Sequence, residues 1–270
     1  MDILTFLYET IPGRFILKPF TSPRFSHVCG RFLDSKYSSC FIRPFVRWNH
    51  IDVAEYETDG IRSFNDFFSR KIKKEKRVVT MDAEKLIAPC DGLLSVWKVD
   101  QDTILPLKQS QYTVPDLLCS KKLAKHYEGG YCLVFRLCVD HYHRYCYIDS
   151  GKKSSNIFIP GKLHTVRPIA LRKVPVFTEN SREYTLIRTK EFGTLVQMEV
   201  GAMLVGRIVN HEGAGRAIRG REKGYFQYGG STIIVLAEPG QVKIREDILK
   251  SSALGRETAV KLGEMIGHAS

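Results

Sequence analysis

Two hydrophobic patterns divide the chain, one with helical spacing and one with the short runs that are typical of strands. Near the N-terminus, apolar residues recur three or four positions apart before the pair Pro12-Gly13, which we interpret as a helix breaker. Farther on, Ser63 precedes Phe64–Phe68 as the cap of a short helix. The pattern predicts a helical region over residues 1–78, whose first apolar stripe is Ile3, Leu4, Phe6, Leu7 and Ile11.

The helical region mixes cations with large apolar side chains. Arg14 and Lys18 flank an apolar run, and Arg43 and Arg47 stand between aromatic residues. This mixture is typical of a helix that lies in a membrane interface. An ordinary helical layer packed on the core has the same pattern, so both interpretations stay open. The basic run from Arg70 to Arg77 is predicted to be a solvated connector.

From residue 86 onward the apolar runs are short and rich in β-branched and aromatic residues, and Gly, Asn or Pro separates most of them. This predicts an α+β fold with a mainly antiparallel β core, barrel-like or sandwich-like, over residues 79–270. One inserted helix is predicted at Pro115–Lys125 and a C-terminal helix from Asp247 to Ile266. The predicted strands are Leu93–Val99, Tyr131–Cys138, Ser155–Ile159, Lys173–Thr178, Tyr184–Arg188, Thr194–Val200, Met203–Val209 and Thr232–Ala237.

The charge balance changes the functional picture more than the rest of the composition does. The chain carries 41 Lys and Arg against 29 Asp and Glu, a formal charge of +12, which favours an anionic partner. We find no nucleic-acid-binding module, so we expect no nucleic acid among the partners, and a lipid headgroup or an anionic metabolite remains. No apolar run approaches the about 20 residues of a membrane span, and no secretory signal is visible. The seven cysteines are odd in number and lack a CxxC pair, so we expect reduced thiols and a cytoplasmic protein.

The tetrapeptide Gly229-Gly230-Ser231-Thr232 stands directly before an apolar strand. Glycines permit a strained turn in which the Ser231 hydroxyl can reach the preceding carbonyl and convert the peptide bond into an ester. Elimination and hydrolysis then leave a pyruvoyl group at a new N-terminus. Taken alone, the same residues also fit an ordinary β-turn.

A second candidate is the segment from Asp140 to Cys146. His141 and His143 would point to the same side of a strand, which suits an acid/base site or half of a metal site. Because no third ligand has a diagnostic spacing, we expect no metal. A purely structural strand end remains the other interpretation.

Two further segments have both a chemical and a structural interpretation. Asp91, within Ala88-Pro89-Cys90-Asp91-Gly92, can form a turn or can orient a catalytic histidine. The segment from Gly201 to Gly224 carries several glycines and cations and can cradle a phosphate, or it is a basic hairpin. It lacks the ending of a P-loop.

Taken in this order along the chain, these segments resemble the phosphatidylserine decarboxylase family over about residues 60–267. Each motif is weak alone, and their common order makes the resemblance specific. The matching stretches are Phe64–Arg70, Ala88–Gly92, Tyr142–Arg144, Pro160–Val166, Asn180–Glu183, Val200–Gly206, Lys223–Thr232 and Gly255–Gly267.

The resemblance implies an enzyme, a carboxy-lyase, that is made as a proenzyme and cleaves itself between Gly230 and Ser231. The β chain would be residues 1–230 and the α chain residues 231–270. The cofactor would be a covalent pyruvoyl group derived from Ser231, with no metal and no pyridoxal phosphate. Its carbonyl takes up the substrate amine and withdraws electrons from the bond to the carboxylate. Phosphatidylserine would become phosphatidylethanolamine, and the family suggests a homodimer.

The resemblance also assigns roles and reveals one departure. Ser231 is the nucleophile, Asp91 matches the triad aspartate, and His143 matches a histidine suited to proton transfer during decarboxylation. The histidine that serves as the triad base is replaced by Cys146, whose neutral thiol is a poor base near pH 7. Cys146 acts as a thiolate, or His141 or His143 takes over the base role, or maturation is slow or absent. We favour a nearby histidine. His141 stands where the family usually has aspartate.

The departure leaves three functional hypotheses. The first is decarboxylation of phosphatidylserine at an anionic membrane, with the enzyme peripheral on the inner face. The second is decarboxylation of a soluble amino acid, and the third is a non-catalytic relative that binds acidic lipid. The apolar and basic N-terminal region favours the first.

Overall fold

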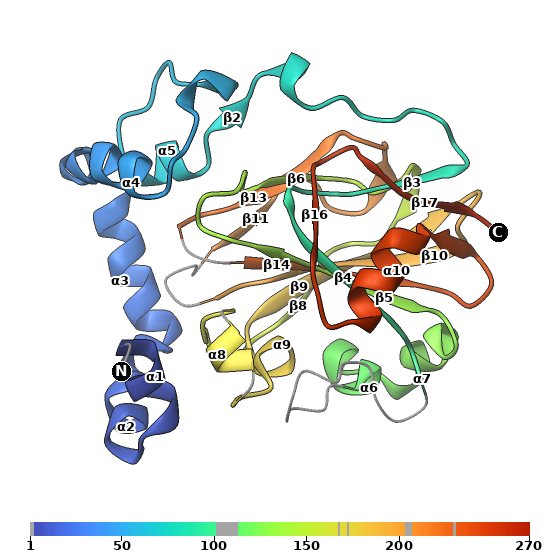
Figure 1. The fold of residues 1–270 in the computed structure, drawn as a ribbon, viewed down its shortest axis with the longest axis horizontal. Helices are drawn as coiled ribbons and strands as arrows, with labels where there is room; N and C mark the ends of the chain where they lie inside the picture. Colours follow the sequence, from blue (N-terminus) through green and yellow to red (C-terminus); the bar gives the residue numbers. More distant parts are fainter. Residues whose placement is uncertain (1–2, 101–112, 167, 172, 203–206, 229–230) are drawn as a thin grey trace.

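A nine-stranded antiparallel sheet forms the centre of the computed structural model (Figure 1). The structure describes residues 3–100, 113–166, 168–171, 173–202, 207–228 and 231–270. The sheet order is β12-β7-β9-β10-β14-β5-β4-β16, and β8 pairs with β9. These strands are β4 (Gly92–Lys98), β5 (Tyr131–Leu137), β7 (Gly151–Lys153), β8 (Ile157–Ile159), β9 (Arg182–Thr189), β10 (Thr194–Val200), β12 (Gly215–Ala217), β14 (Ser231–Ala237) and β16 (Thr258–Val260).

Three smaller antiparallel sheets accompany the central one. Their orders are β11-β13-β6, β15-β17-β3 and β1-β2. The predicted α+β class with an antiparallel β core is confirmed, and among the described strands the central sheet does not close into a barrel. The strands are β1 (Tyr56–Glu57), β2 (Lys71–Ile72), β3 (Lys85–Ile87), β6 (Arg144–Cys146), β11 (Ile208–Asn210), β13 (Glu222–Phe226), β15 (Val242–Ile244) and β17 (Met265–Ala269).

Strand β14 lies in the middle of the sheet and is buried on both faces. Ile233 and Val235 pack into one hydrophobic cluster, which the small sheets cover, whereas Ile234 and Leu236 pack into a second cluster. Helices α6 (Val114–Leu118), α7 (Lys121–Ala124) and α9 (Val176–Glu179) contribute to that second cluster. Because side chains alternate along a strand, Ser231 belongs to the face of Ile233 and Val235.

An N-terminal arm of helices runs along one side of the sheet (Figure 1). The arm meets the core at its start, where α1 contacts α8 (Pro168–Leu171). A Cβ atom on Gly13 would lie 2.1 Å from the carbonyl oxygen of Phe6, so glycine permits the close crossing of the first two helices. The elements of this part are α1 (Ile3–Glu9), α2 (Ile11–Phe20), α3 (Pro23–Leu33), η1 (Lys36–Phe41), α4 (Ile42–Trp48), η2 (Val53–Glu55), α5 (Phe64–Phe68) and η3 (Lys74–Lys76).

Near the N-terminus, the capped helix at Phe64–Phe68 is confirmed, whereas Pro12-Gly13 lies inside α2 and does not break a helix, because the break comes earlier, at Thr10. The first helix ends at Glu9, and Pro12 stands in the first turn of α2, where its missing N–H group is tolerated. In α5, the Ser63 hydroxyl accepts from the backbone N–H of Asp66, and the Asp66 carboxylate accepts from the backbone N–H of Ser63. This capping box fixes the entry into α5.

Three other predictions were wrong in detail. Lys173–Thr178 is not a strand, because Pro175 precedes the short helix α9, which buries Val176 and Phe177. Pro115–Lys125 forms α6, α7 and the turn η4 (Lys125–Tyr127), because Cys119 takes a left-handed φ of 50° and Ser120 caps a new helix.

The predicted C-terminal helix is also shorter than expected. Helix α10 (Glu246–Ala253) ends before Gly255, whose φ is +68°. The chain then forms β16 and β17, in place of helix as far as Ile266. Of the predicted strand Met203–Val209, residues 203–206 lie outside the described part, and β11 begins at Ile208.

Candidate active site

Strand β14 holds Ser231 at its first position, fully buried and opposite Leu137 of the neighbouring strand β5. Both neighbouring strands continue along β14, so its backbone is fixed by ladders on either side. Gly229 and Gly230, which complete the predicted cleavage motif, lie outside the described residues.

His143 is the side chain that meets Ser231. Its Nδ1 lies 3.3 Å from the Ser231 Oγ, and its Nε2 lies 3.1 Å from the carbonyl oxygen of Cys138. A carbonyl oxygen only accepts, so in the neutral ring the proton resides on Nε2, which donates to Cys138. Nδ1 then presents its lone pair to the serine hydroxyl, which is the arrangement that a base needs to activate a nucleophile.

The turn before β6 brings both histidines to one backbone unit. The Nδ1 of His141 accepts from the backbone N–H of Cys138 at 3.1 Å, while the carbonyl of that residue accepts from His143. The segment is a turn and not the strand on which the same-side argument depended. The histidines still converge, because each binds a different group of Cys138.

Phe68 and Arg70, from the end of α5 and the residues after it, cover His143. The Phe68 ring stacks on the histidine ring with centroids 4.1 Å apart. Burial, the positive charge of Arg70 and the nearby His141 lower the pKa of His143 well below its ordinary value. His143 is therefore neutral at neutral pH and keeps its lone pair available.

Arg70 is itself an unusual group. It is buried, and its guanidinium lies 4.0 Å from the centroid of the Tyr56 ring. Its Nη1 donates to the carbonyl of Phe67, but Nε and Nη2 have no hydrogen-bond partner among the described residues. Burial lowers the pKa of this guanidinium. An arginine with unpaired buried nitrogens is costly for stability, which is a reason to seek a function for it.

Asp91, in the turn between β3 and β4, lies in a different environment from the one that the triad resemblance implied. Its carboxylate forms a salt bridge with Arg77 and accepts from the backbone N–H of Leu262 at 2.9 Å. Within the described part of the chain, Asp91 makes no hydrogen bond to a histidine. The Asp91 carboxylate nevertheless connects distant segments, because it binds Arg77 of the connector after α5 and Leu262 of the turn before β17.

The same contacts correct the prediction for the basic run. Arg70 is 2% exposed, and the side chain of Arg77 is 6% exposed. Only the middle of the run is solvated: Lys71, Lys74, Glu75 and Lys76 are exposed. The two ends bury their guanidinium groups against ring faces and a carboxylate, which side-chain charge alone did not indicate.

Cys146 is buried in the hydrophobic cluster on the Ser231 face of the sheet. Its backbone N–H donates to the carbonyl of Pro89 at 2.8 Å. Burial raises the pKa of its thiol to about 12. At pH 8 only about one thiol in ten thousand would be ionised, so a thiolate base at this position is disfavoured.

The turn also holds a group of metal-type ligands. One ligand atom from each of Cys138, Asp140 and His141 lies within 4.8 Å of the others. The Sγ of Cys138 accepts from Nη1 of Arg136 at 3.2 Å, and this cation disfavours a metal ion there. The sequence indicated no third ligand near the two histidines, whereas the structure brings three possible ligand atoms together on one turn.

Sequence reasoning missed the individual roles of Phe68, Arg70 and Arg77. The signal that was available is the stretch Phe64–Arg70, which belongs to the matched motifs without a chemical reason attached. An aromatic pair with an arginine two positions after it can cover a histidine with a ring and a charge. The sequence does not show this arrangement, because Phe68 and His143 are 75 residues apart in the chain and come into contact only in the folded protein.

The comparisons with known proteins identify a family for the chain. The family model described as phosphatidylserine decarboxylase matches residues 64–268. The chain is 46% identical over 268 residues to phosphatidylserine decarboxylase proenzyme 2 of Clostridium acetobutylicum, covering 99% of this chain and 92% of the relative. It is 40% identical to the phosphatidylserine decarboxylase proenzymes of Ruminiclostridium cellulolyticum and Clostridium tetani, covering 98% of this chain and 91% of each relative.

Both the family model and the relatives match far more than half of the chain. The chain therefore belongs to the phosphatidylserine decarboxylase family. The resemblance drawn from the order of the motifs is confirmed.

Proposed function

We propose that this member of the family is a proenzyme that cleaves itself at Ser231 and, once mature, decarboxylates phosphatidylserine to phosphatidylethanolamine. The carboxy-lyase class follows from the family. The single observation that carries the proposal at the level of atoms is the His143 ring. Its Nδ1 lies 3.3 Å from the Ser231 Oγ, and its other nitrogen is held by a backbone carbonyl.

Maturation begins when His143 takes the proton of the Ser231 hydroxyl at Nδ1. The Ser231 oxygen then bonds to the carbonyl carbon of Gly230, the amide C–N bond breaks, and the freed amine receives a proton, so that an ester replaces the peptide bond. Loss of the Cα proton of residue 231 expels the Gly230 carboxylate from Cβ. The resulting enamine becomes an imine, and water converts it to a pyruvoyl group with release of ammonia.

The residues around Ser231 fit a pyruvoyl group. Such a group is small and uncharged, and Ser231 occupies a fully buried position on a central strand with a neutral histidine beside it. Its carbonyl, once formed, takes up an amine and withdraws electrons from the bond to the neighbouring carboxylate. His143 is placed to hold or deliver a proton at that position, and the Phe68 ring excludes water from the histidine.

The remaining site residues act through others in this proposal. His141 positions Cys138, whose carbonyl holds His143. Asp91 positions the connector that carries Arg70 and Arg77. Cys146 fills the core and supplies no thiolate, so a histidine takes over the base role that the family motif gives to a second histidine.

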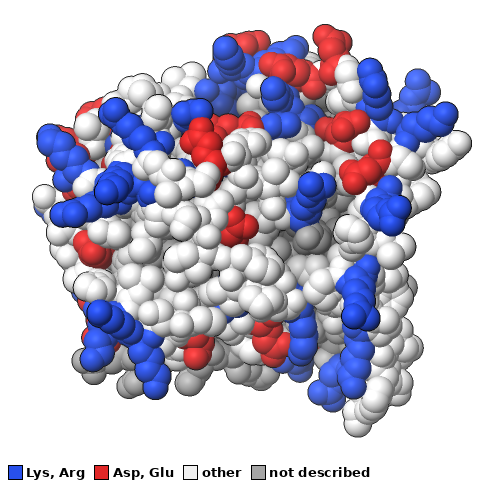
Figure 2. Space-filling model, turned by 180° about the vertical axis from the view of Figure 1, so that it is seen from behind, with Lys and Arg blue, Asp and Glu red and all other residues white. Residues whose placement is uncertain are grey.

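The N-terminal arm supports a lipid surface as the place of the reaction. Phe15 of α2 is 65% exposed and Trp48 of α4 is 86% exposed, beside Arg14, Lys18 and Arg47. The stretch from Ile11 to Leu33 contains no Asp or Glu. In Figure 2 the arm follows the right-hand edge, where Lys and Arg side chains stand among uncharged ones. Exposed apolar groups flanked by cations suit the headgroup region of an anionic membrane.

No helix within the described residues is long and apolar enough to cross a membrane. The proposal therefore relies on side chains that enter the interface. Phe15→Ser should weaken flotation with phosphatidylserine vesicles severalfold, whereas Phe158→Ser, at a similarly exposed phenylalanine of β8, should leave it unchanged. Equal flotation of both variants and the wild type would remove the arm from the account.

Decarboxylation is tested with phosphatidylserine vesicles, with the lipid product identified by mass spectrometry. The mature wild-type protein should form phosphatidylethanolamine, Ser231→Ala should form none, and free serine should not be decarboxylated. Release of carbon dioxide from serine but not from the lipid would favour a decarboxylase of soluble amino acids. No product from either substrate by a fully cleaved protein would contradict the proposed activity.

A further inference from the structure

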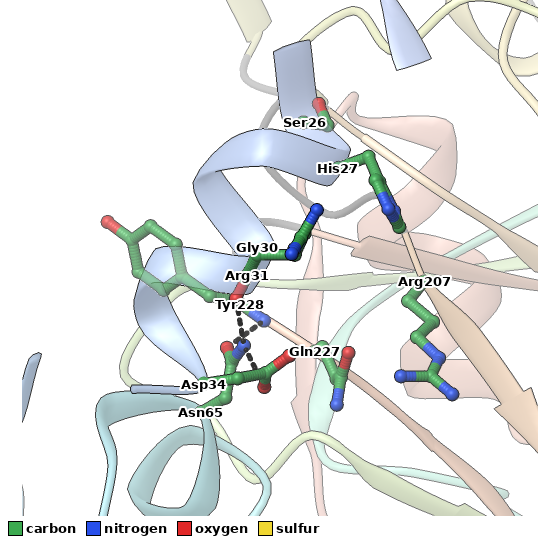
Figure 3. A pocket seen from close by; sticks show the side chains of 9 residues that line it. All are labelled: Ser26, His27, Gly30, Arg31, Asp34, Asn65, Arg207, Gln227 and Tyr228. Carbon is green, nitrogen blue, oxygen red and sulfur yellow. Dashed lines mark hydrogen bonds between the residues drawn. The ribbon is translucent and has the colours of Figure 1, made fainter. Parts of the chain in front are cut away.

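A cavity of about 420 Å³ lies between the arm and the chain segment that leads into Ser231 (Figure 3). His27 and Arg31 of α3 form one wall, and Arg207 and Tyr228 form the other. Asn65, buried in α5, closes one side. The volume lies in the range of small-molecule sites.

The charges in this cavity are unbalanced. Neither Arg31 nor Arg207 has an ion-pair or hydrogen-bond partner for its guanidinium among the described residues. The one acidic lining residue, Asp34, accepts a hydrogen bond from Nδ2 of Asn65 at 2.8 Å. Figure 3 shows the His27 ring pointing toward Arg207 across the cavity. Both arginines line the cavity, and a guanidinium group is suited to an anion with several oxygens, above all a phosphate.

The cavity is joined to the catalytic residues by packed rings. The Tyr228 ring lies edge-on to Phe68 with centroids 5.2 Å apart, and Phe68 stacks on His143. Tyr228 also precedes Ser231 by three residues, a span of at most about 10 Å along the chain. In a phosphoserine diester, four bonds of about 1.5 Å separate the amine from phosphorus, so about 5 Å lie between the two groups. The separation of amine and phosphorus therefore lies within this upper limit.

The outer side of α3 faces away from the cavity. Val28 is 66% exposed and Phe32 is 50% exposed, each one position after a cavity-lining residue. A lipid whose acyl chains stay in the interface beside these residues can pass its phosphate behind the helix. A free phosphate has no such reason to be bound there, so the location favours a lipid headgroup.

From the free guanidinium groups and this location we infer that the cavity is the subsite for the phosphodiester of the lipid substrate, with Arg31 and Arg207 as its ligands. This inference rests on the proposed function, which it deepens. It assigns recognition of the phosphate to the arm and the core jointly. The arm would then contribute to substrate selection as well as to membrane attachment.

The test uses mature protein and dihexanoyl-phosphatidylserine below its aggregation concentration, so that membrane attraction plays no part. Arg207→Gln and Arg31→Gln should each raise KM about tenfold while kcat stays within about twofold, because the contact is made equally in ground and transition states. Arg24→Gln is the matched control, since Arg24 is an exposed arginine of the same helix outside the cavity. It should leave both constants unchanged. Each variant is first checked for complete cleavage.

A second experiment measures binding of inorganic phosphate and of glycerophosphate by calorimetry, without reference to activity. Both should bind the wild type more tightly than the Arg207→Gln variant, and glycerophosphate should bind more tightly than inorganic phosphate. Unchanged KM in both variants, an equal rise in Arg24→Gln, or phosphate binding that is indifferent to Arg207 would overturn the subsite. A wild type that binds glycerophosphate in an Arg207-dependent manner but releases no carbon dioxide would contradict the proposed activity and leave the subsite standing.

Discussion

The turn before β6 carries His143, whereas the turn before β4 carries Asp91, the aspartate that the resemblance assigns to a triad, and the two residues lie in different environments. In the first, His143 contacts the Ser231 hydroxyl and is held by the carbonyl of Cys138. In the second, Asp91 is engaged with Arg77 and with the backbone of Leu262. A carbonyl can fix the tautomer of a histidine as a carboxylate does, although it supplies no full negative charge. A serine can therefore acquire an oriented base without the carboxylate.

The largest expected effect comes from removing the contact in the first turn. His143→Ala should slow self-cleavage by about a thousandfold or more, in the range of losing a general base in a nucleophilic step. His141→Ala should slow it by less than about tenfold, because this residue acts only through the N–H of Cys138. Cleavage is followed on denaturing gels. The reverse ranking of the two variants would move the base role to His141.

The second turn should give an effect on stability instead. Asp91→Asn and Arg77→Met each break a salt bridge whose side chains are 10% and 6% exposed, so each should lower the free energy of unfolding by about 2–4 kcal/mol. Urea denaturation of both variants in a Ser231→Ala background gives the values for an uncleaved chain.

Asp82→Asn is the control for that experiment, because the salt bridge between Asp82 and Lys85 is about half exposed, and its loss should change stability by less than about 1 kcal/mol. The claim that Asp91 contributes to stability and does not orient the base would be contradicted if Asp91→Asn slowed cleavage at least tenfold while Arg77→Met did not. That result would return Asp91 to a direct role in orienting the base.

A smaller effect is expected in the pH profile. The folded-state pKa of His143 lies below the ordinary value of about 6.5, so between the two values the unfolded chain binds the extra proton. The stability contribution of neutral His143 is therefore present above pH 6.5 and declines as the pH falls below it. For the same reason, the cleavage rate should stay level from pH 8 to pH 6.

Arg70→Met should raise the pKa of His143, because it removes the positive charge that is the second-largest cause of the lowering, and the acid limb of the profile should move to higher pH. Arg62→Met, at an exposed arginine before α5, should leave the limb in place. A profile in Arg70→Met that coincides with the wild type would show that the charge of Arg70 does not contribute to this pKa.

The smallest effect is expected at Cys146. Cys146→Ser should cleave within about threefold of the wild-type rate, because the buried thiol has a pKa of about 12 and supplies no thiolate. Cys146→His would restore the usual motif, but the larger ring has to enter a packed cluster and should lower stability. The thiol would be identified as the base if Cys146→Ser failed to cleave and the cleavage rate of the wild type rose steeply toward alkaline pH.

Some of this arrangement was predictable because it is local or strongly patterned. The short apolar run Thr232–Ala237 predicted a strand, and the Ser63 cap predicted α5. The motif order was enough to identify the family, since spacing along the chain needs no knowledge of contacts. The homodimer implied by the same resemblance stays a prediction.

Other features depend on contacts between distant residues. Nothing in the sequence around Asp91 shows that Arg77 occupies its carboxylate, and the charged run that contains Arg77 resembles a solvated segment. The stretch from Asp247 to Ile266 has a helical pattern, but α10 ends before Gly255, whose φ is +68°, and β17 then pairs with β3 and β15. Local pattern specifies elements, whereas partners of charged groups are set by the assembled fold.

Intact-mass analysis of the purified chain over time tests the central claim most directly. We predict that the wild-type protein separates into residues 1–230 and a smaller chain of residues 231–270 that begins with a pyruvoyl group, while His143→Ala keeps the mass of the intact chain over the same period. A wild-type protein that remains a single chain, or a His143→Ala variant that yields both fragments at the wild-type rate, would contradict the account.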